Sequence, residues 1–468
     1  MVAEHLTVRN LTRKPVVLKQ VERFNPPDGP KTLSGTFTTM MSNITGSPAE
    51  VTAIQDGTEP FDRRDVDVRV ESFKEVASND IRAFDKSDKE RMRLTFEVEG
   101  EKYQIQVPLP TKETITMKPL SPNPRFHLTG IYIPEHSHLA IFSSANLNSW
   151  MRELKDDTLT SALSIPGTHN SPTCHVAPPS VRCQAVSPRE QLDNGVRFFD
   201  IRMHPQWPDD ASKDGLLLSH SVFPISLTGQ KTFRDMLNEI EGFLDLNPSE
   251  TLIMSIKREG AGEHNDDQLA NVLKTHYTNA KPSRWYTDTK VPTLGEARGK
   301  IVLVRRFNIP EHLRKEHDGR GWGIDATGWA DNTDYHTCPS GTICIQDFYE
   351  VLETENIEKK INFVNAQLCR SAECCYPVGT LKTDGGDRCP YFINFLSASN
   401  FWKVQTWPEK VAGKLNPATV DYICRRHKAD KGDWSTGIIV CDWVGKDGDW
   451  DLVRCIVGMN TKLAMKQH

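Results

Sequence analysis

The sequence predicts an α/β protein in which an N-terminal all-β domain of the sandwich type precedes a (β/α)8 barrel of the TIM type. Residues 1–140 hold short β-branched runs separated by Pro, Gly, Asn and Asp clusters, the pattern of an antiparallel β domain. Residues 145–468 instead alternate apolar strand-like runs with helical stretches, the pattern of a parallel sheet or barrel. The 468 residues suffice for two or three domains.

The strand signals of the first domain are runs in which apolar and polar residues alternate. They are HLTVRNLT at 5–12, PVVLKQVERF at 15–24, RLTFEVEG at 93–100, KYQIQVPL at 102–109 and HLAIFSS at 138–144. Residues 1–140 contain no cluster of catalytic side chains. We therefore expect this domain to serve as an adaptor for a membrane or for a partner.

The second domain contains eight apolar runs that we predict as barrel strands. They are ALSIPG at 162–167, RFFDIRM at 197–203, GLLLSHS at 215–221, TLIMSIK at 251–257, KIVLVRR at 300–306, ICIQDFY at 343–349, FINFLSAS at 392–399 and GIIVCDW at 437–443. Helical stretches between them lie at 232–248, 266–277, 356–368 and 418–426. In a barrel, side chains at the strand C-terminal ends converge on one mouth, where active sites are built.

Composition excludes several classes of protein. Lys and Arg number 57 against 62 Asp and Glu, a net charge of −5, so nothing favours binding to nucleic acid. No run approaches the roughly 18–20 apolar residues of a membrane-spanning helix. The N-terminus lacks a recognisable secretory signal. If Met1 is the true start, we expect a cytoplasmic or peripheral membrane protein, with secretion possible only through processing that the sequence does not represent.

Four motifs at predicted strand ends carry groups suited to phosphodiester chemistry. They are Ser164–Ser171 (SIPGTHNS), Gly195–Arg202 (GVRFFDIR), Leu218–Ser221 (LSHS) and Val440–Trp443 (VCDW). Together they supply two histidines, two aspartates and an arginine, which is a general base, a general acid, orienting carboxylates and a cation for developing charge. Each alone has a structural reading: a capping histidine, an ion pair between two residues of one strand face, or a strand-end cap.

The same motifs, with ETLIMSIKRE, PTLGEARGKIVLVRRF, IQDFYEV and LNPATVDYI, resemble the X-domain barrel of bacterial-type phosphatidylinositol-specific phospholipase C. The resemblance covers residues 145–468 in family order, and the two-part layout is similar to fungal phospholipase C-like phosphodiesterases. It implies attack by the inositol 2-hydroxyl on the phosphodiester. The products are diacylglycerol and a cyclic inositol phosphate, and the partners are a phosphatidylinositol-like headgroup and, transiently, a membrane surface.

The resemblance also assigns roles to residues of this chain. His169 matches the general base, Asp442 the carboxylate that orients it and His220 the general acid. Arg202 matches the arginine that contacts the phosphate, and Asp200 holds the charge network. Four further residues match positions that contact the inositol ring: Lys257, Arg306, Asp347 and Tyr349.

Neither a cofactor nor a metal is expected. Calcium takes 6–8 oxygen ligands, and the calcium-dependent relatives have acidic residues where this chain has Arg202 and Lys257. Asn170 departs from the bacterial pattern, which has Asp immediately after the first histidine to support the general acid. An amide cannot hold an imidazolium by charge, so we expect weaker support for His220 and a slower reaction.

Eleven cysteines leave two structural readings open. In an oxidising compartment, Cys174–Cys183 and Cys338–Cys344 are expected as local disulfides. A zinc site is the other reading, although no CxxC pair occurs.

Two functional alternatives also remain. One is a lipid-binding barrel of weak or no activity, motivated by Asn170. The other is a phosphodiesterase for another phospholipid or a glycerophosphodiester.

Overall fold

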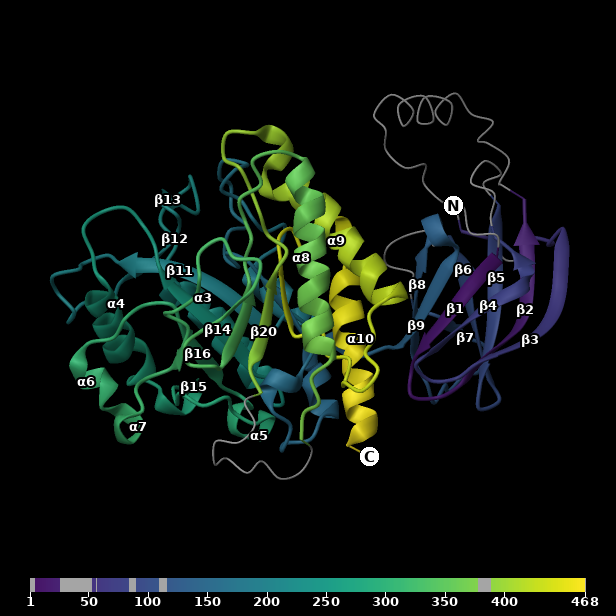
Figure 1. Ribbon diagram of the computed structural model, residues 1–468, viewed down its shortest axis with the longest axis horizontal. Helices are drawn as coiled ribbons and strands as arrows, with labels where there is room; N and C mark the ends of the chain where they lie inside the picture. Colours follow the sequence, from purple (N-terminus) through teal and green to yellow (C-terminus); the bar gives the residue numbers. More distant parts are fainter. Residues whose placement is uncertain are drawn as a thin grey trace. The chain divides into compact units, whose positions relative to one another are not determined.

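The computed structural model describes residues 5–25, 53–55, 57–83, 90–108, 116–377 and 389–467. The chain divides into two compact units, Met1–Ser144 and Ala145–His468. They are called unit 1 and unit 2 below, and Figure 1 labels their elements. In the described part of the chain, no helix combines the length and the apolar character needed to cross a membrane.

Unit 1 contains two sheets, with strand orders β4-β1-β9-β8 and β3-β2-β5-β6-β7. The strands are β1 (His5–Leu11), β2 (Val16–Phe24), β3 (Asp62–Val70), β4 (Lys74–Arg82), β5 (Arg91–Val98), β6 (Glu101–Val107), β7 (Lys118–Pro119), β8 (Leu128–Ile133) and β9 (His138–Ser143). Strands β1 and β9 pair in parallel, and the other pairs are antiparallel. Leu6 and Ile141 of one sheet share a buried cluster with Leu18 and Phe96 of the other, so the sheets enclose one core.

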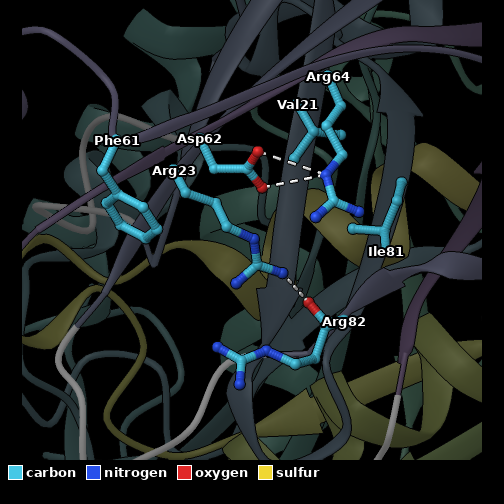
Figure 2. Close-up of a pocket in the computed structure, with 7 residues that line it drawn as sticks. All are labelled: Val21, Arg23, Phe61, Asp62, Arg64, Ile81 and Arg82. Atoms are coloured by element: carbon cyan, nitrogen blue, oxygen red, sulfur yellow. Dashed lines mark hydrogen bonds and ion pairs between the residues drawn. The ribbon is translucent and has the colours of Figure 1, made fainter.

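A hollow of about 310 Å³ lies in unit 1 (Figure 2). Its lining includes Arg23, Arg64 and Arg82. Arg64 pairs with Asp62 at 3.1 Å, and Arg23 pairs with Glu90 at 2.8 Å. Arg82 lies 3.5 Å from the same Glu90. Because each of the three guanidinium groups already contacts a carboxylate, we assign no anion site to this hollow.

Unit 2 is built on a curled parallel sheet in the order β16-β14-β11-β10-β21-β20-β19. These strands are β10 (Ile165–Thr168), β11 (Phe198–Pro205), β14 (Leu252–Arg258), β16 (Ile301–Arg305), β19 (Ile343–Gln346), β20 (Tyr391–Phe395) and β21 (Ile438–Cys441). Their residues are almost entirely buried, as expected of parallel strands covered on both faces.

Helices follow or separate these strands. They are α2 (Pro188–Asp193), α3 (Phe233–Leu246), α4 (Asp266–Leu273), α5 (Leu294–Ala297), α6 (Glu311–Arg314), α7 (Glu316–Gly319), α8 (Glu355–Ala372), α9 (Pro408–Arg425) and α10 (Asp451–Lys466). Helix α3 shows the local cause: the Thr232 side chain caps its start, and Phe233, Leu237 and Ile240 share its buried face. Helices α8, α9 and α10 pack side by side along the sheet (Figure 1). The predicted alternation of strands and helices is confirmed.

The prediction of eight parallel barrel strands is wrong in one element. The run GLLLSHS forms β12 (Leu216–His220), which pairs antiparallel with β11 rather than joining the parallel series. The connection is only QWPDDASKDG, whereas a parallel crossover needs a dozen or more residues and usually a helix. Among the described residues the sheet remains open between β16 and β19. The short strands β17 (Ile324–Asp325) and β18 (His336–Thr337) flank that opening.

A buried ion pair ties the start of β11 to the rest of unit 2. Arg197 and Glu250 are both fully buried, 3.0 Å apart. Arg197 also donates to the carbonyls of Leu147 and Asn148 at 3.0 and 2.9 Å. Since removal of one partner leaves an uncompensated buried charge, Arg197→Met should lower the free energy of unfolding by about 3–5 kcal/mol.

Urea unfolding checks this expectation against Arg189→Met, which removes the same side chain from an exposed pair with Asp193. The control should lose less than about 0.5 kcal/mol. Equal losses in the two variants would contradict the role given to Arg197.

Candidate active site

The register of two neighbouring strands brings His169 and Asp442 together. Thr168 of β10 pairs in parallel with Cys441 of β21, so the residues that follow them leave the sheet side by side. His169 Nδ1 lies 2.8 Å from Asp442 Oδ1, and the Asp442 side chain is only 2% exposed. The carboxylate accepts a hydrogen bond from the Nδ1–H group of His169, which leaves the Nε2 lone pair free to accept a proton.

His220, at the end of β12, faces His169. The two ring centroids are 5.9 Å apart in an edge-on arrangement. His220 Nδ1 is 2.7 Å from the carbonyl oxygen of Val181, which makes Nδ1 the donor and turns Nε2 away from that contact. Burial, with smaller contributions from His169 and Arg202, lowers the pKa of His220 to about 4. The ligand-free protein therefore holds this imidazole neutral near pH 7.

This shift predicts acid sensitivity of the fold. An unfolded histidine has a pKa near 6.5, so between about pH 6.5 and 4 the unfolded chain binds more protons than the native chain. The free energy of unfolding should therefore fall as the pH drops through that window. Urea unfolding of wild type and His220→Gln at pH 7 and pH 4.5 measures the difference. An identical pH dependence in both proteins would contradict the shift.

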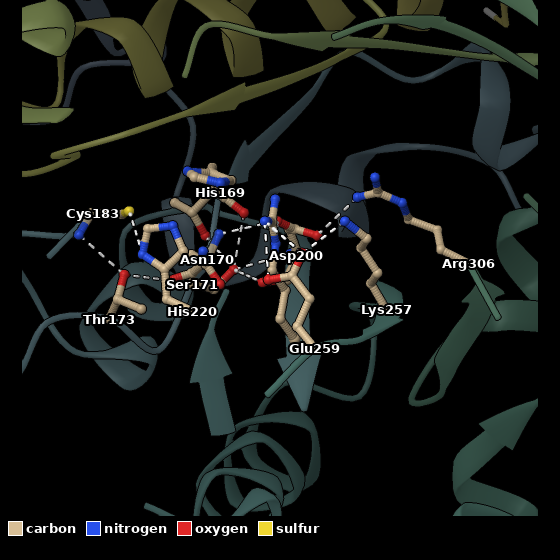
Figure 3. A network of polar contacts seen from close by, with 12 residues as sticks. His169, Asn170, Ser171, Thr173, Cys183, Asp200, His220, Lys257, Glu259 and Arg306 are labelled. Atoms are coloured by element: carbon tan, nitrogen blue, oxygen red, sulfur yellow. Dashed lines mark hydrogen bonds and ion pairs between the residues drawn. The ribbon is translucent and has the colours of Figure 1, made fainter. Parts of the chain in front are cut away.

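Arg202 forms ion pairs with two carboxylates, Asp200 and Glu259, both of which are labelled in Figure 3. Its Nε donates to Asp200 Oδ2 at 3.1 Å, and its Nη1 donates to Glu259 Oε1 at 3.0 Å. Lys257 donates to the same Glu259 oxygen at 2.7 Å. Burial opposes the ionised form of Glu259, but Arg202 and Lys257 outweigh it and lower the pKa of that carboxyl. The cluster is therefore fully charged and geometrically fixed.

Asp200 is completely buried behind this cluster. Besides Arg202, it accepts from Arg306 Nη1 at 3.5 Å and from the backbone N–H of Asn170 at 3.2 Å. Burial raises the pKa of Asp200, and Arg202 and Arg306 reverse that effect and lower it. Asp200 and Arg202 do lie on one face of the strand, as their two-residue spacing predicts.

Arg306 connects this cluster to the opposite side of the site. Its guanidinium lies 3.8 Å from the ring centroid of Trp329 and 3.9 Å from Asp347 Oδ2. Trp329 Nε1 donates to the same Asp347 oxygen at 3.1 Å. Burial raises the pKa of Asp347 above its ordinary value. Tyr349 is half-exposed and donates its hydroxyl to Asp331 at 2.9 Å.

A cavity of about 670 Å³ unites these groups. Eight of the ten predicted site residues line it: His169, Arg202, His220, Lys257, Arg306, Asp347, Tyr349 and Asp442. The other two, Asp200 and Asn170, are fully buried behind the lining.

For Asn170 we expect weaker support of His220 than an aspartate would give, and in the structure this residue makes a further contact through its backbone. Its backbone has a left-handed φ of 43°, which asparagine tolerates, and this turn points its N–H at Asp200. Its side-chain amide has no hydrogen-bond partner within the described residues. The backbone of Asn170 thus joins the network, while the Val181 carbonyl orients His220.

Three residues of the site were missed by sequence reasoning. Glu259 lies two residues after Lys257, directly after the end of β14. This spacing puts both side chains on one face and could have indicated Glu259. Lys360 lies on the buried face of α8 between Ile357 and Val364. Its spacing of three and four residues from these apolar residues could have indicated a buried lysine. No sequence pattern could have indicated Cys183, because it lies in the loop between β10 and α2.

Lys360 secures the segment that carries Asp347 and Tyr349. Its Nζ donates to Gln346 Oε1 at 3.1 Å and to the Phe348 carbonyl at 2.5 Å. Burial lowers the pKa of Lys360 to about 7. Phe348 lies between the two cavity residues, so this buried amine anchors their backbone.

Cys183 lies beside His220, with its Sγ 3.8 Å from Nδ1. Both Cys174 and Cys183 are thiols in the structure, as are Cys338 and Cys344, so neither expected local disulfide is formed. The Cys183 thiol instead donates to the Val181 carbonyl at 3.5 Å, the same oxygen that accepts from His220 Nδ1.

Comparison with known families shows which proteins part of this chain is similar to. Residues 160–307 match the family model of phosphatidylinositol-specific phospholipase C, X domain. The resemblance that the motifs indicated is thereby confirmed.

Among individual proteins, the 1-phosphatidylinositol phosphodiesterase of Staphylococcus aureus (strain Newman) is 26% identical over 350 residues, covering 71% of this chain and 100% of the relative. That of Listeria monocytogenes serovar 1/2a is 34% identical over 183 residues, covering 37% and 53%. A structure of a double mutant of the phosphatidylinositol-specific phospholipase C from S. aureus superposes with a TM-score of 0.52 at 24% identity, covering 67% of this chain and 97% of that one. It shows a shared fold.

Proposed function

We propose that this chain cleaves the phosphodiester of phosphatidylinositol, or of a lipid with the same headgroup chemistry, by attack of the inositol 2-hydroxyl on phosphorus. The observation that carries the proposal is the pair of opposed histidines, one backed by Asp442, in a cavity that also presents Arg202. An intramolecular nucleophile needs only orientation and two proton carriers, and this arrangement supplies both.

The proton transfers follow from the two hydrogen-bonded imidazoles. His169 Nε2 accepts the proton of the 2-hydroxyl, and Asp442 stabilises the imidazolium that forms. His220 donates a proton to the diacylglycerol oxygen as the P–O bond breaks. Because its pKa is about 4 in the ligand-free protein, the negative charge of the bound phosphate must raise that pKa before His220 can act as an acid.

Arg202 is the group best placed to stabilise charge on the phosphate. Asp200 and Glu259 hold its guanidinium from two sides, so little reorganisation is needed when negative charge develops. Lys257, Arg306, Asp347 and Tyr349 line the same cavity and offer both donors and acceptors to a polyol ring.

The charge arrangement also supports metal independence. The carboxylates of Asp200, Glu259 and Asp347 each contact a basic side chain of the cavity. Calcium needs several carboxylate or carbonyl oxygens, and here cations already occupy the place of the metal charge.

The test is release of cyclic inositol phosphate from phosphatidylinositol vesicles in the presence of EDTA. Product in EDTA supports the proposal. Activity that appears only after calcium is added would overturn the metal-independent mechanism. No product under either condition, with vesicles still bound, would favour a lipid-binding barrel without catalysis.

An aromatic rim, defined as Phe223, Phe401 and Trp402, lines the same cavity and is suited to a lipid surface. Phe223 and Phe401 stack with centroids 5.6 Å apart, and Trp402 is 88% exposed. Indole side chains favour the membrane interface. We expect Trp402→Ala to weaken vesicle binding about tenfold, since burying a large apolar side chain contributes roughly 1.5–3 kcal/mol.

Vesicle cosedimentation measures this effect, with Trp207→Ala as the matched control. Trp207 is also exposed but does not line the cavity. Equal binding by the two variants would remove the rim from the proposed membrane contact.

A further inference from the structure

Cys183 adds a third metal-binding donor close to the two histidines of the site. His169, Cys183 and His220 each offer one ligand atom, and the three atoms lie within 4.8 Å of one another. Figure 3 shows the thiol directed at the His220 ring. Cys183 itself lies outside the phosphate-binding cluster and takes no part in the proposed proton transfers, whereas the two histidines carry them out.

The position of Cys183 is fixed by the loops that carry the histidine and the aspartate. Its backbone N–H donates to Thr173 Oγ1 at 3.1 Å, and its carbonyl accepts the N–H of Trp443 at 2.7 Å. Trp443 follows Asp442 directly. The thiol is therefore held in register with the base and its carboxylate.

Imidazole nitrogen and thiolate sulfur are both zinc donors, and a zinc site with three protein ligands leaves a fourth position to water or another small ligand. Asp442 completes the second shell, because a metal-binding histidine usually donates its other ring N–H to a carboxylate. His169 and His220 line the cavity, so an ion can reach their rings from the cavity.

We propose that His169, Cys183 and His220 bind one zinc ion, and that this ion inhibits the enzyme. The Cys183 thiol loses its proton to solvent when its sulfur bonds to the metal. The ion occupies the His169 lone pair that serves as general base and one ring nitrogen of His220. The inhibitory part of the inference rests on the proposed function, whereas zinc binding does not.

Binding is tested on the full-length protein by competition with a chromogenic zinc chelator. We expect wild type to bind one zinc ion in a Cys183-dependent manner and Cys183→Ser to bind it at least about tenfold more weakly. Cys174→Ser, a thiol of the same loop, is the matched control and should bind as wild type does. Equal affinity in wild type and Cys183→Ser would overturn the site.

A spectroscopic measurement tests the site on wild-type protein alone, so that its result does not depend on whether a variant folds. Cobalt(II) bound to wild-type protein should show thiolate-to-cobalt charge-transfer absorption, and zinc should abolish it. Its absence would overturn thiolate ligation.

Inhibition is measured as the ratio of activity with and without zinc within each variant. Zinc should inhibit wild type and Cys174→Ser, and EDTA should reverse this inhibition. Zinc should inhibit Cys183→Ser at least about tenfold less effectively. Cys183-dependent binding without inhibition would overturn the regulatory claim. If zinc binding depends on Cys183 but wild type releases no cyclic product, the proposed function is refuted and the metal site still stands.

Discussion

His169→Ala should lower the release of cyclic inositol phosphate by about 10³–10⁴-fold, because it removes the only cavity imidazole whose Nδ1 is held by a carboxylate in the described structure. The loss should appear in kcat rather than in vesicle binding, since His169 is not one of the three rim residues proposed to contact the membrane. Asp442→Asn should cost less, because the imidazole remains while its orientation and the charge opposite the imidazolium are lost.

The measurement is initial-rate kinetics on phosphatidylinositol vesicles, with cosedimentation as the binding control. A loss below tenfold in His169→Ala would remove this residue from the role of general base. Rates of Asp442→Asn equal to wild type would show that the 2.8 Å contact does not matter for turnover.

Arg202→Met should lower kcat by about 10²–10³-fold, because it removes a preorganised donor from the position where negative charge develops. Arg202→Lys keeps the charge but cannot contact Asp200 and Glu259 from both sides, so we expect an intermediate loss. The KM should change less than kcat, since the interaction is strongest in the transition state.

Removal of Arg202 can also destabilise the fold, and the experiment must separate this effect from a direct effect on catalysis. Asp200 is fully buried, and Arg306 alone, 3.5 Å away, then balances it. Urea unfolding of both variants identifies any loss of fold. Rates within fivefold of wild type in folded Arg202→Met would refute the phosphate role.

Local sequence patterns were sufficient for much of unit 2. Apolar runs of strand length predicted the parallel strands, because such strands are buried on both faces. The same runs located His169 and Asp442 at strand ends, although 273 positions separate them along the chain. The two-residue spacing of Asp200 and Arg202 also predicted their shared face correctly, since side chains alternate along a strand.

The pattern could not distinguish β12 from a parallel strand. An apolar run reports burial and not the direction of its partner, and the short preceding loop was the decisive feature. Asn170 shows the same limit at the level of one residue. Its identity predicted only that its side chain would support His220 weakly. The left-handed turn that directs its backbone N–H at Asp200 was not predictable from that identity.

The sequence by itself thus determined the alternation of strands and helices in unit 2 and the set of polar side chains at its strand ends. These depend on periodicity and on spacing within one segment. Tertiary structure alone decided that Val181 orients His220, that Glu259 contacts Arg202, and that Cys183 lies beside His220. Such contacts join segments whose separation is set by strand register and loop path, and local sequence carries no information on either.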